Sequence, residues 1–192
     1  MPNPAVEHTL RAETSGDIGG IRGVHLAAFP TAYEADLVDS LRKSAAAWTG
    51  LSFVTVVDGH VVAHVLLTKC GIVPAREGSR DGKDATGGNQ DGETEVQPAL
   101  CLAPVAVLPA FQRSGHGTRL VKHALAQASS TSPALPVVVL GHPEYYPRFG
   151  FRPARHHRIH APFKLGDPDA LMILNAGDVQ PGVVRYASEF GL

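Results

Sequence analysis

The sequence predicts a mixed α/β fold of the α+β class, with a twisted, mostly antiparallel sheet, a central parallel βαβ unit and helices on both faces. Two observations support this prediction. Asp58-Gly59 separates two apolar, β-branched runs, which is the strongest short-range pattern for a β-hairpin. Farther along, an apolar run, an amphipathic segment and a second β-branched run follow in the order of a right-handed βαβ crossover.

The first part of the chain predicts a strand, two helices and the hairpin. The alternating segment 8–13 is expected as a strand. Residues 18–28 carry apolar side chains at helical spacing, but three glycines lower the helix propensity, so packing must hold this helix. Residues 33–41 are expected as a second helix, and the hairpin strands as 51–57 and 60–67.

Between Pro74 and Pro98 the chain has no apolar periodicity and is rich in glycine and charged residues. We predict a flexible insertion at 75–97 inside a single domain that covers residues 1–192. A domain boundary is the competing interpretation, but the hairpin before it has no other sheet to join.

The second part of the chain predicts the crossover and the end of the sheet. Segment 100–107 is expected as a strand, 116–128 as the crossover helix with one apolar stripe, and 137–141 as a buried parallel strand. Segments 171–174 and 183–186 are expected as closing antiparallel strands.

Composition indicates a globular protein with one core. The 192 residues are 44% hydrophobic and 18% charged. A formal net charge of −1 argues against a nucleic-acid partner bound through a broad basic field. The N-terminus does not resemble a signal peptide, and the longest uncharged apolar stretch, 98–111, is too short to span a bilayer. We therefore expect a cytoplasmic protein that has no membrane partner.

We expect neither a disulfide framework nor a metal site. Cys70 and Cys101 fall on neighbouring expected strands and are expected as buried free thiols. The histidines within 156–160 have spacing that suggests metal ligands, but no fourth ligand accompanies them. His25 and His64 fall on apolar faces and are expected to be hydrogen-bonded core histidines.

The loop 112–117 carries the clearest chemical signal. An apolar run ends at Pro109, and Gln112-x-x-Gly115-x-Gly117 then opens onto the crossover helix. The first N–H groups of a helix lack intrahelical partners, and glycines let a ligand approach the backbone, so the loop predicts a phosphate pocket. A dinucleotide-binding loop would need a third glycine where Leu120 stands, and the P-loop sequence Gly-Lys-Ser/Thr is absent.

A second motif strengthens this interpretation. Segment 137–141 is followed by His142-Pro-Glu-Tyr-Tyr-Pro-Arg-Phe-Gly-Phe151. The two motifs in this order resemble the GNAT superfamily of N-acetyltransferases, and Gly-His-Pro-x-Tyr-Tyr-x-Arg-Phe-Gly-Phe resembles its YhbS-like branch. The resemblance implies a GNAT-type sheet and an enzyme that moves an acetyl group from acetyl-coenzyme A to an amine by direct attack in a ternary complex. The insertion at 75–97 departs from the short turn of many relatives.

The resemblance also implies a set of cofactor contacts. Backbone groups of the strand would bind the pantetheine arm, and the loop would wrap the pyrophosphate. The expected residues are Val105, Ala106, Val107, Gln112, Arg113, Ser114, Gly115, His116, Gly117 and Thr118. Arg119 and Lys122, with Arg113, are further candidates for phosphate contact because of their charge.

For catalysis, the resemblance implies that Tyr146 protonates the departing thiolate, and Tyr145 is the alternative acid. No carboxylate stands at the end of segment 137–141, so His142 is the best-placed candidate base and Glu144 the second. A water chain to solvent could serve equally.

Three questions stay open at this point. The acceptor amine could belong to a small molecule or to a protein. The chain could also be a non-catalytic acyl-coenzyme A binding module. A monomer and a homodimer are both compatible with the sequence.

Overall fold

The computed structural model describes residues 8–75 and 95–192, which fall into two compact units. The first unit contains the described residues up to Lys69, with Leu102–Ala134 and Glu189–Gly191. The second contains the described residues within Cys70–Cys101, with Leu135–Ser188 and Leu192. Most of the insertion predicted at 75–97 lies outside the described residues.

The first unit holds the three α-helices and the N-terminal strands. Its elements are β1 His8–Ala12, α1 Ile18–Ala28, α2 Tyr33–Lys43, β2 Trp48–Val57, most of β3 His60–Pro74, the second half of β4 Gln97–Val107, and α3 His116–Thr131. Short 3-10 helices stand at Ser15–Asp17, Pro109–Phe111 and Ser188–Phe190. β2 pairs antiparallel with both β1 and β3. The strand, the two helices and the hairpin expected in this part of the chain are confirmed.

The hairpin turn has the geometry that its sequence predicts. Val57 pairs with His60, and the two residues between them, Asp58 and Gly59, have φ of 47° and 79°. Positive φ at both central residues matches the right-handed twist of the strands, and aspartate and glycine adopt it more readily than most residues.

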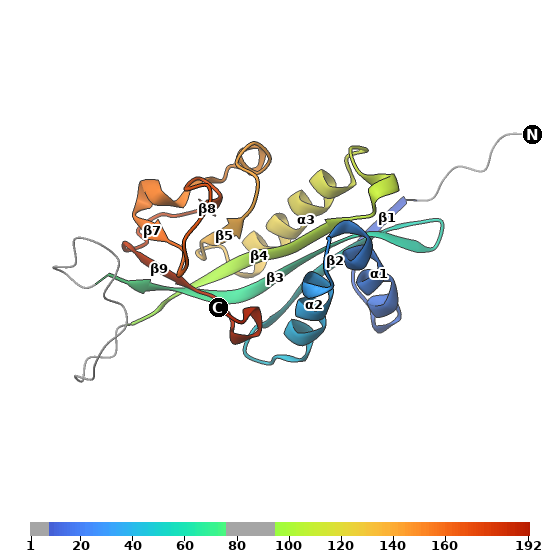
Figure 1. Ribbon diagram of the computed structural model, residues 1–192, viewed down its shortest axis with the longest axis horizontal. Coiled ribbons are helices and arrows are strands. Elements are labelled where there is room, and N and C mark those ends of the chain that lie inside the picture. The colour runs from blue at the N-terminus through green and yellow to red at the C-terminus, as the bar shows by residue number, and fades with distance from the viewer. Residues whose placement is uncertain (1–7, 76–94) are drawn as a thin grey trace, which may run out of the picture. The chain divides into compact units, whose positions relative to one another are not determined.

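The helices cover both faces of the sheet in this unit, as expected (Figure 1). On one face, Ile21 of α1, Val38 of α2 and Val54 of β2 form a buried apolar cluster. On the other, the ring of Phe53 on β2 meets His123 of α3 edge-on, with 4.8 Å between ring centroids. Because Phe53 and Val54 are consecutive, the strand alternation alone sends them to opposite helix layers.

The glycines of α1 allow close packing on the sheet. A Cβ at Gly20 would lie 3.0 Å from Val61 Cγ2, so a side chain there would push the helix away from β3. Ile21 and Val24 are each 1% exposed. Burial of this face compensates for the low helix propensity, which confirms that packing holds α1.

The second unit completes the sheet with short strands. These are β5 Val137–Leu140, β6 Arg152–Pro153, β7 Ile159–His160, β8 Leu171–Leu174 and β9 Gly182–Arg185, with 3-10 helices at Tyr146–Phe149 and Ala154–His157. β5 pairs parallel with β4 and antiparallel with β8, which also pairs with β6. β9 pairs antiparallel with the end of β3 and parallel with β7. The expected α+β class, mostly antiparallel with a parallel βαβ unit, is confirmed.

Several elements are longer than predicted, and for two of them the structure shows the reason. β3 continues to Pro74 because residues 71–74 pair with β9, a strand more than a hundred residues later in the chain. α3 ends at Thr131, three residues past the expected end at 128. The hydroxyls of Ser130 and Thr131 donate to the carbonyls of Ala126 and Gln127, so these residues keep to the helix although they often end one.

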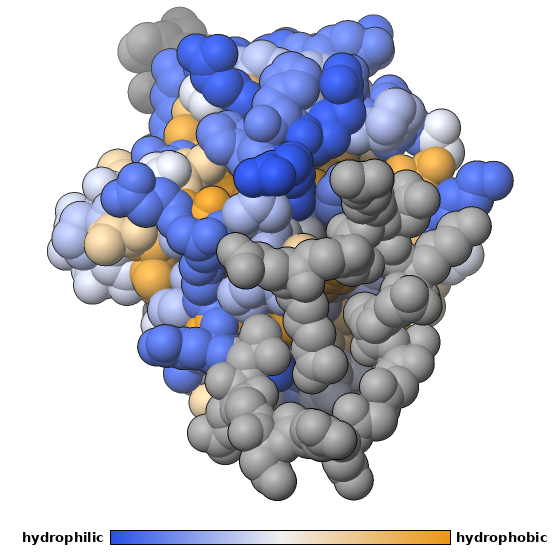
Figure 2. All heavy atoms as spheres, turned by 90° about the vertical axis from the view of Figure 1, so that its left-hand side faces the viewer, coloured by the Kyte–Doolittle hydropathy of each residue, from blue (hydrophilic) through white to orange (hydrophobic). Residues whose placement is uncertain are grey.

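The side shown in Figure 2 is largely polar where it is described. Hydrophilic residues cover most of this face, and apolar residues form small separate patches. Within the described ranges, no helix is long and apolar enough to cross a membrane.

Candidate active site

The loop before α3 has two residues in the left-handed region. Arg113 has a φ of 59° and Gly115 a φ of 87°, and Gly115 is the N-cap of the helix. No side chain caps this helix start, so the first N–H groups of α3 stay available to an anion. A non-glycine residue such as Arg113 rarely adopts positive φ, and such strain is concentrated at binding sites.

Side chains of the loop fix its backbone to the end of β4. The Gln112 amide donates to the Val107 carbonyl at 3.0 Å, and the Ser114 hydroxyl donates to the Phe111 carbonyl. Both side chains are therefore engaged with the protein. Their expected contacts with a cofactor would be made through the backbone.

Arg119 lies over the loop. A Cβ at Gly115 would be 3.5 Å from Arg119 Nη1, and Arg119 Nη2 is 3.4 Å from His116 Nδ1. The guanidinium adds positive charge where the helix start already favours an anion. Gly117 is the second residue of α3, and its φ is not positive. Only Gly115 therefore needs glycine for conformational reasons.

The His116 side chain packs inward. It is 3% exposed, stacks on His8 with ring centroids 5.4 Å apart, and meets Phe111 edge-on. Burial, followed by the charge of Arg119, lowers its pKa. Any contact of His116 with a cofactor would therefore come from its backbone N–H. Thr118, in the same helical turn, is half-buried.

The end of β4 keeps one edge open. Its parallel ladder with β5 is confined to Leu100 and Cys101, so from Leu102 to Val107 this edge has no ladder partner among the described residues. On the other edge, the N–H of Leu108 donates to the Val62 carbonyl at 2.9 Å, which fixes the strand to β3. Of the three predicted contact residues here, Ala106 is buried, and Val105 and Val107 are half-buried.

Tyr146 lies within an aromatic cluster of the second unit. It is 8% exposed, and its ring meets those of Tyr145 and Phe151 edge-on, at 5.1 and 5.8 Å between centroids. Burial, with smaller effects from Tyr145 and Cys101, raises the pKa of the phenol. The hydroxyl therefore carries its proton at neutral pH and can donate it.

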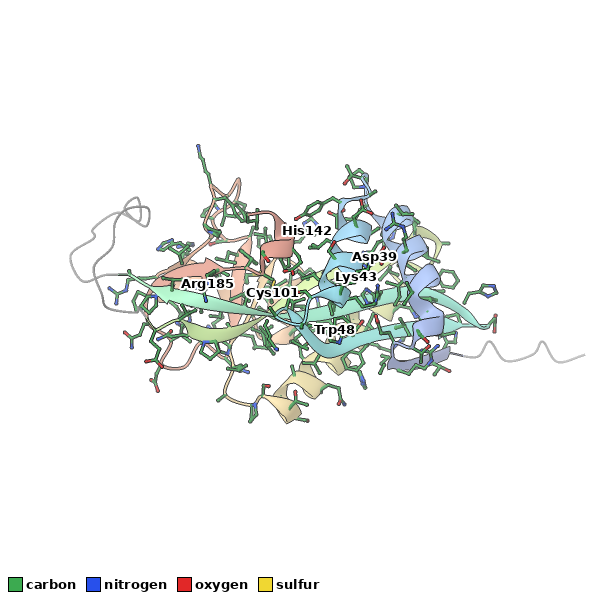
Figure 3. All side chains as sticks on the ribbon, turned by 90° about the horizontal axis from the view of Figure 1, so that it is seen from below. Asp39, Lys43, Trp48, Cys101, His142 and Arg185 are labelled. Atoms are coloured by element: carbon green, nitrogen blue, oxygen red, sulfur yellow. The ribbon has the colours of Figure 1, made fainter. Side chains whose placement is uncertain are left out.

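The other candidate groups of this turn are more open. His142 and Glu144 are exposed, and His142 stands two residues past the end of β5. Figure 3 labels the His142 side chain. Tyr145 is half-buried, and the Arg148 guanidinium lies 4.5 Å from the centre of its ring. The structure brings no carboxylate onto β5, so the base remains a prediction.

The first unit contains a buried polar network that sequence reasoning missed. The Glu13 carboxylate accepts from Arg42 Nε at 2.8 Å and from the Ser52 hydroxyl. Ser52 Oγ lies 2.8 Å from His64 Nε2, and His64 Nδ1 lies 2.9 Å from His25 Nε2. The expectation of core histidines is confirmed, but nothing local in the sequence links these five residues, which come from four elements and from the residue after β1.

These contacts define the protonation states of the network. Because the one hydroxyl proton of Ser52 goes to Glu13, His64 Nε2 must donate to Ser52. In a neutral His64, Nδ1 then accepts from His25 Nε2, and His25 Nδ1 is left as a buried acceptor that has no partner among the described residues. Burial lowers the pKa of both histidines, that of His25 to about 3. Burial opposes ionisation of Glu13, but bonds from His64, Arg42 and Ser52 prevail and lower its pKa to about 2.

Both cysteines carry free thiols; Cys101 is buried, as expected, whereas Cys70 is half-buried. Burial raises the pKa of the Cys101 thiol to about 12, so neither nucleophilic attack nor metal binding by this side chain is favoured. In the described part of the chain, no cluster of three or more His, Cys, Asp or Glu residues could hold a metal ion.

The loop before α3 and the turn that carries Tyr146 both fall within the range matched by one family model. The family model "Acetyltransferase (GNAT) family" matches residues 20–151, a range that contains both. The "Uncharacterized N-acetyltransferase YjhQ" of Escherichia coli (strain K12) is 32% identical over 145 residues, which are 76% of this chain and 70% of that protein.

Two solved structures share the fold. YhbS from Escherichia coli, in complex with CoA, has a TM-score of 0.77 and 24% identity, and the match covers 100% of this chain and 96% of that one. A GNAT family acetyltransferase from Brucella melitensis, in complex with acetyl-CoA, has a TM-score of 0.68 and 30% identity, with coverage of 96% and 98%.

Proposed function

The chain belongs to the acetyltransferase (GNAT) family, and from this we propose that it transfers the acetyl group of acetyl-coenzyme A to an acceptor amine. The observation that carries the proposal is the loop before α3. It joins an uncapped helix start, a left-handed Gly115 and the Arg119 guanidinium, which together suit a diphosphate. The relatives crystallised with CoA and acetyl-CoA support the same co-substrate.

The strand before this loop would hold the rest of the cofactor. The open edge of β4 from Leu102 to Val107 offers backbone N–H and C=O groups that an amide-containing pantetheine arm can pair with. The Gln112 side chain bonds to the Val107 carbonyl, which ties the diphosphate loop to this edge.

The reaction proceeds by direct attack. The amine nitrogen attacks the thioester carbonyl carbon, the carbon–sulfur bond breaks, and the leaving sulfur takes a proton from the Tyr146 hydroxyl. The nitrogen loses one proton as the amide forms, and Tyr146 regains one from solvent. The raised pKa of Tyr146 keeps the acid form populated.

His142 is the first candidate for the base, and Glu144 and a water chain are the alternatives. His142 is exposed just past β5, which gives it access to solvent and to a bound amine. An amine can also lose its proton to water before it binds.

Two measurements on the full chain test the proposal. Calorimetry should detect binding of coenzyme A, and a thiol-release assay over a broad amine panel should detect turnover with at least one amine. Binding of coenzyme A without thiol release on any amine would instead favour a non-catalytic acyl-coenzyme A binding module. Failure to bind coenzyme A would refute both functions.

A further inference from the structure

Gly141 lies against the Cε2 edge of the Tyr146 ring. A Cβ built on Gly141 would be 2.4 Å from Tyr146 Cε2, 3.1 Å from Cδ2 and 3.3 Å from Cζ. Carbon atoms do not pack at the first of these distances, since the van der Waals optimum is about 3.5–4.0 Å. The phenol ring therefore occupies the space that any side chain at residue 141 would take.

Conformation does not explain this glycine. Its φ is not in the positive range, and its N–H donates to the Ala170 carbonyl at 2.9 Å, as any residue's N–H could. What distinguishes residue 141 is the contact with Tyr146.

Three aromatic rings also pack around the Tyr146 ring. Tyr145 and Phe151 pack against it edge-on, and Phe149 lies 6.3 Å away between centroids. The ring cannot retreat from a new side chain at residue 141 unless these aromatic rings also move, and close-packed interiors resist such shifts.

We propose that Gly141 is a positioning residue for Tyr146, and that its missing side chain sets the depth and direction of the phenol. This inference rests on the proposed role of Tyr146 as the acid.

Gly141→Ala tests the inference in the full chain. The methyl group displaces the ring, so turnover should fall at least tenfold while KM for acetyl-coenzyme A changes little, because a misplaced acid acts on the transition state. Gly166→Ala is the matched control, since a Cβ there meets nothing within 4 Å and its φ is not positive. It should leave both constants unchanged.

Comparing the double variant with the two single variants distinguishes a positioning role of Gly141 from a general disruption of the structure. If Gly141 acts through the Tyr146 hydroxyl alone, Gly141→Ala should add little to the loss already caused by Tyr146→Phe. Additive losses would overturn the inference.

A readout that needs no substrate distinguishes this inference from the proposed function. The chain has four tyrosines, so ring-carbon NMR can follow each phenol as the pH rises. Because burial raises the Tyr146 pKa, displacement by Gly141→Ala should bring its titration to lower pH, and Gly166→Ala should not. An unchanged Tyr146 titration overturns the inference. A shifted titration beside wild-type turnover of Tyr146→Phe supports positioning and refutes the acid role.

If Gly141→Ala does not fold, thermal unfolding of a double variant still tests whether the Tyr146 ring is what excludes a side chain at residue 141. Tyr146→Ala removes the ring, so adding Gly141→Ala to it should lower the Tm by no more than a few degrees. A loss of folding in the double variant would show that the overlap with Tyr146 is not the reason for the glycine.

Discussion

At the scale of single residues, Tyr146 carries the sharpest prediction about chemistry. Tyr146→Phe should lower turnover by about 10²–10⁴-fold, the usual contribution of a positioned acid, and leave the dissociation constant of the cofactor nearly unchanged. The hydroxyl matters mainly as charge develops on sulfur. Steady-state kinetics and calorimetry measure the two quantities.

Tyr145→Phe is the internal control for that experiment. Its ring is half-buried beneath Arg148, and its hydroxyl has no assigned part in the reaction. Loss of turnover in Tyr145→Phe alone would move the acid one residue along the chain, and full activity of both variants would exclude a tyrosine acid.

The loop glycines make separate predictions. Gly117→Val keeps an allowed backbone but places a side chain near the expected diphosphate, so the cofactor should bind at least tenfold more weakly, about 1.4 kcal/mol. Gly115→Ala adds strain from a φ of 87° and should weaken binding while also lowering the Tm. Gly23→Ala, at a site open to solvent, should change neither binding nor activity. Unchanged affinity in folded Gly117→Val would remove this loop from the site.

At the scale of elements, the buried histidine network ties β1, α1, α2, β2 and β3 together. Glu13 follows β1, and the other members stand on the helices and strands. The fold keeps these histidines neutral. When the pH is low enough for the same histidines to be protonated in the unfolded chain, the unfolded state gains stability and the folded state loses it by comparison.

The network predicts acid destabilisation. His25 has an ordinary pKa of 6.5 when unfolded and about 3 when folded, so stability is complete above pH 6.5 and is lost as the pH falls toward 3. From pH 7.5 to 5 the free energy of unfolding should drop by about 2 kcal/mol through His25, and His64, whose pKa burial also lowers, adds a loss of the same sign. Glu13, with a folded pKa of about 2 against 4.5, adds a further loss below pH 4.5.

Denaturant titrations at several pH values check this. His25→Leu should weaken the pH dependence between 7.5 and 5, since one of the two buried histidines that take up a proton on unfolding is gone. His60→Leu, at an exposed position of the hairpin turn, should leave the dependence as it is. An equal dependence in both variants would contradict the assignment of neutral histidines.

At the scale of the whole molecule, the insertion predicted at 75–97 should be dispensable for folding. The chain is anchored on both sides of the segment 76–94: the Ala75 N–H donates to the Pro181 carbonyl, and the Gln97 side chain accepts from the Gln180 N–H. Loop length adds only slowly to the entropy of closure. Replacing 76–94 by a short Gly-Ser link should therefore leave the Tm within a few degrees.

Two outcomes of that replacement carry further meaning. A chain that no longer folds would show that the insertion is structural. A folded chain with intact coenzyme A binding and an altered range of amines would assign the segment to acceptor selection.

Local pattern was enough to predict much of this protein. The hairpin follows from Asp58-Gly59, the crossover from three consecutive runs, and the loop that opens α3 from glycine spacing, because neighbouring residues determine each of these features. The pairing of β3 with β9 could not be predicted from local pattern, since it depends on residues far apart in the chain.

The tertiary structure alone decided the roles of several ordinary residues. Glu13 and Ser52 give no signal in the sequence, yet they complete the hydrogen bonds of His64. Gly141 reads as the end of a strand, and only the packing of Tyr146 shows why no side chain fits there. Periodicity in the sequence indicates which face of a helix or strand is buried. Which residues meet across that face depends on how the whole chain folds, and for this reason only the tertiary structure could show the roles of Glu13, Ser52 and Gly141.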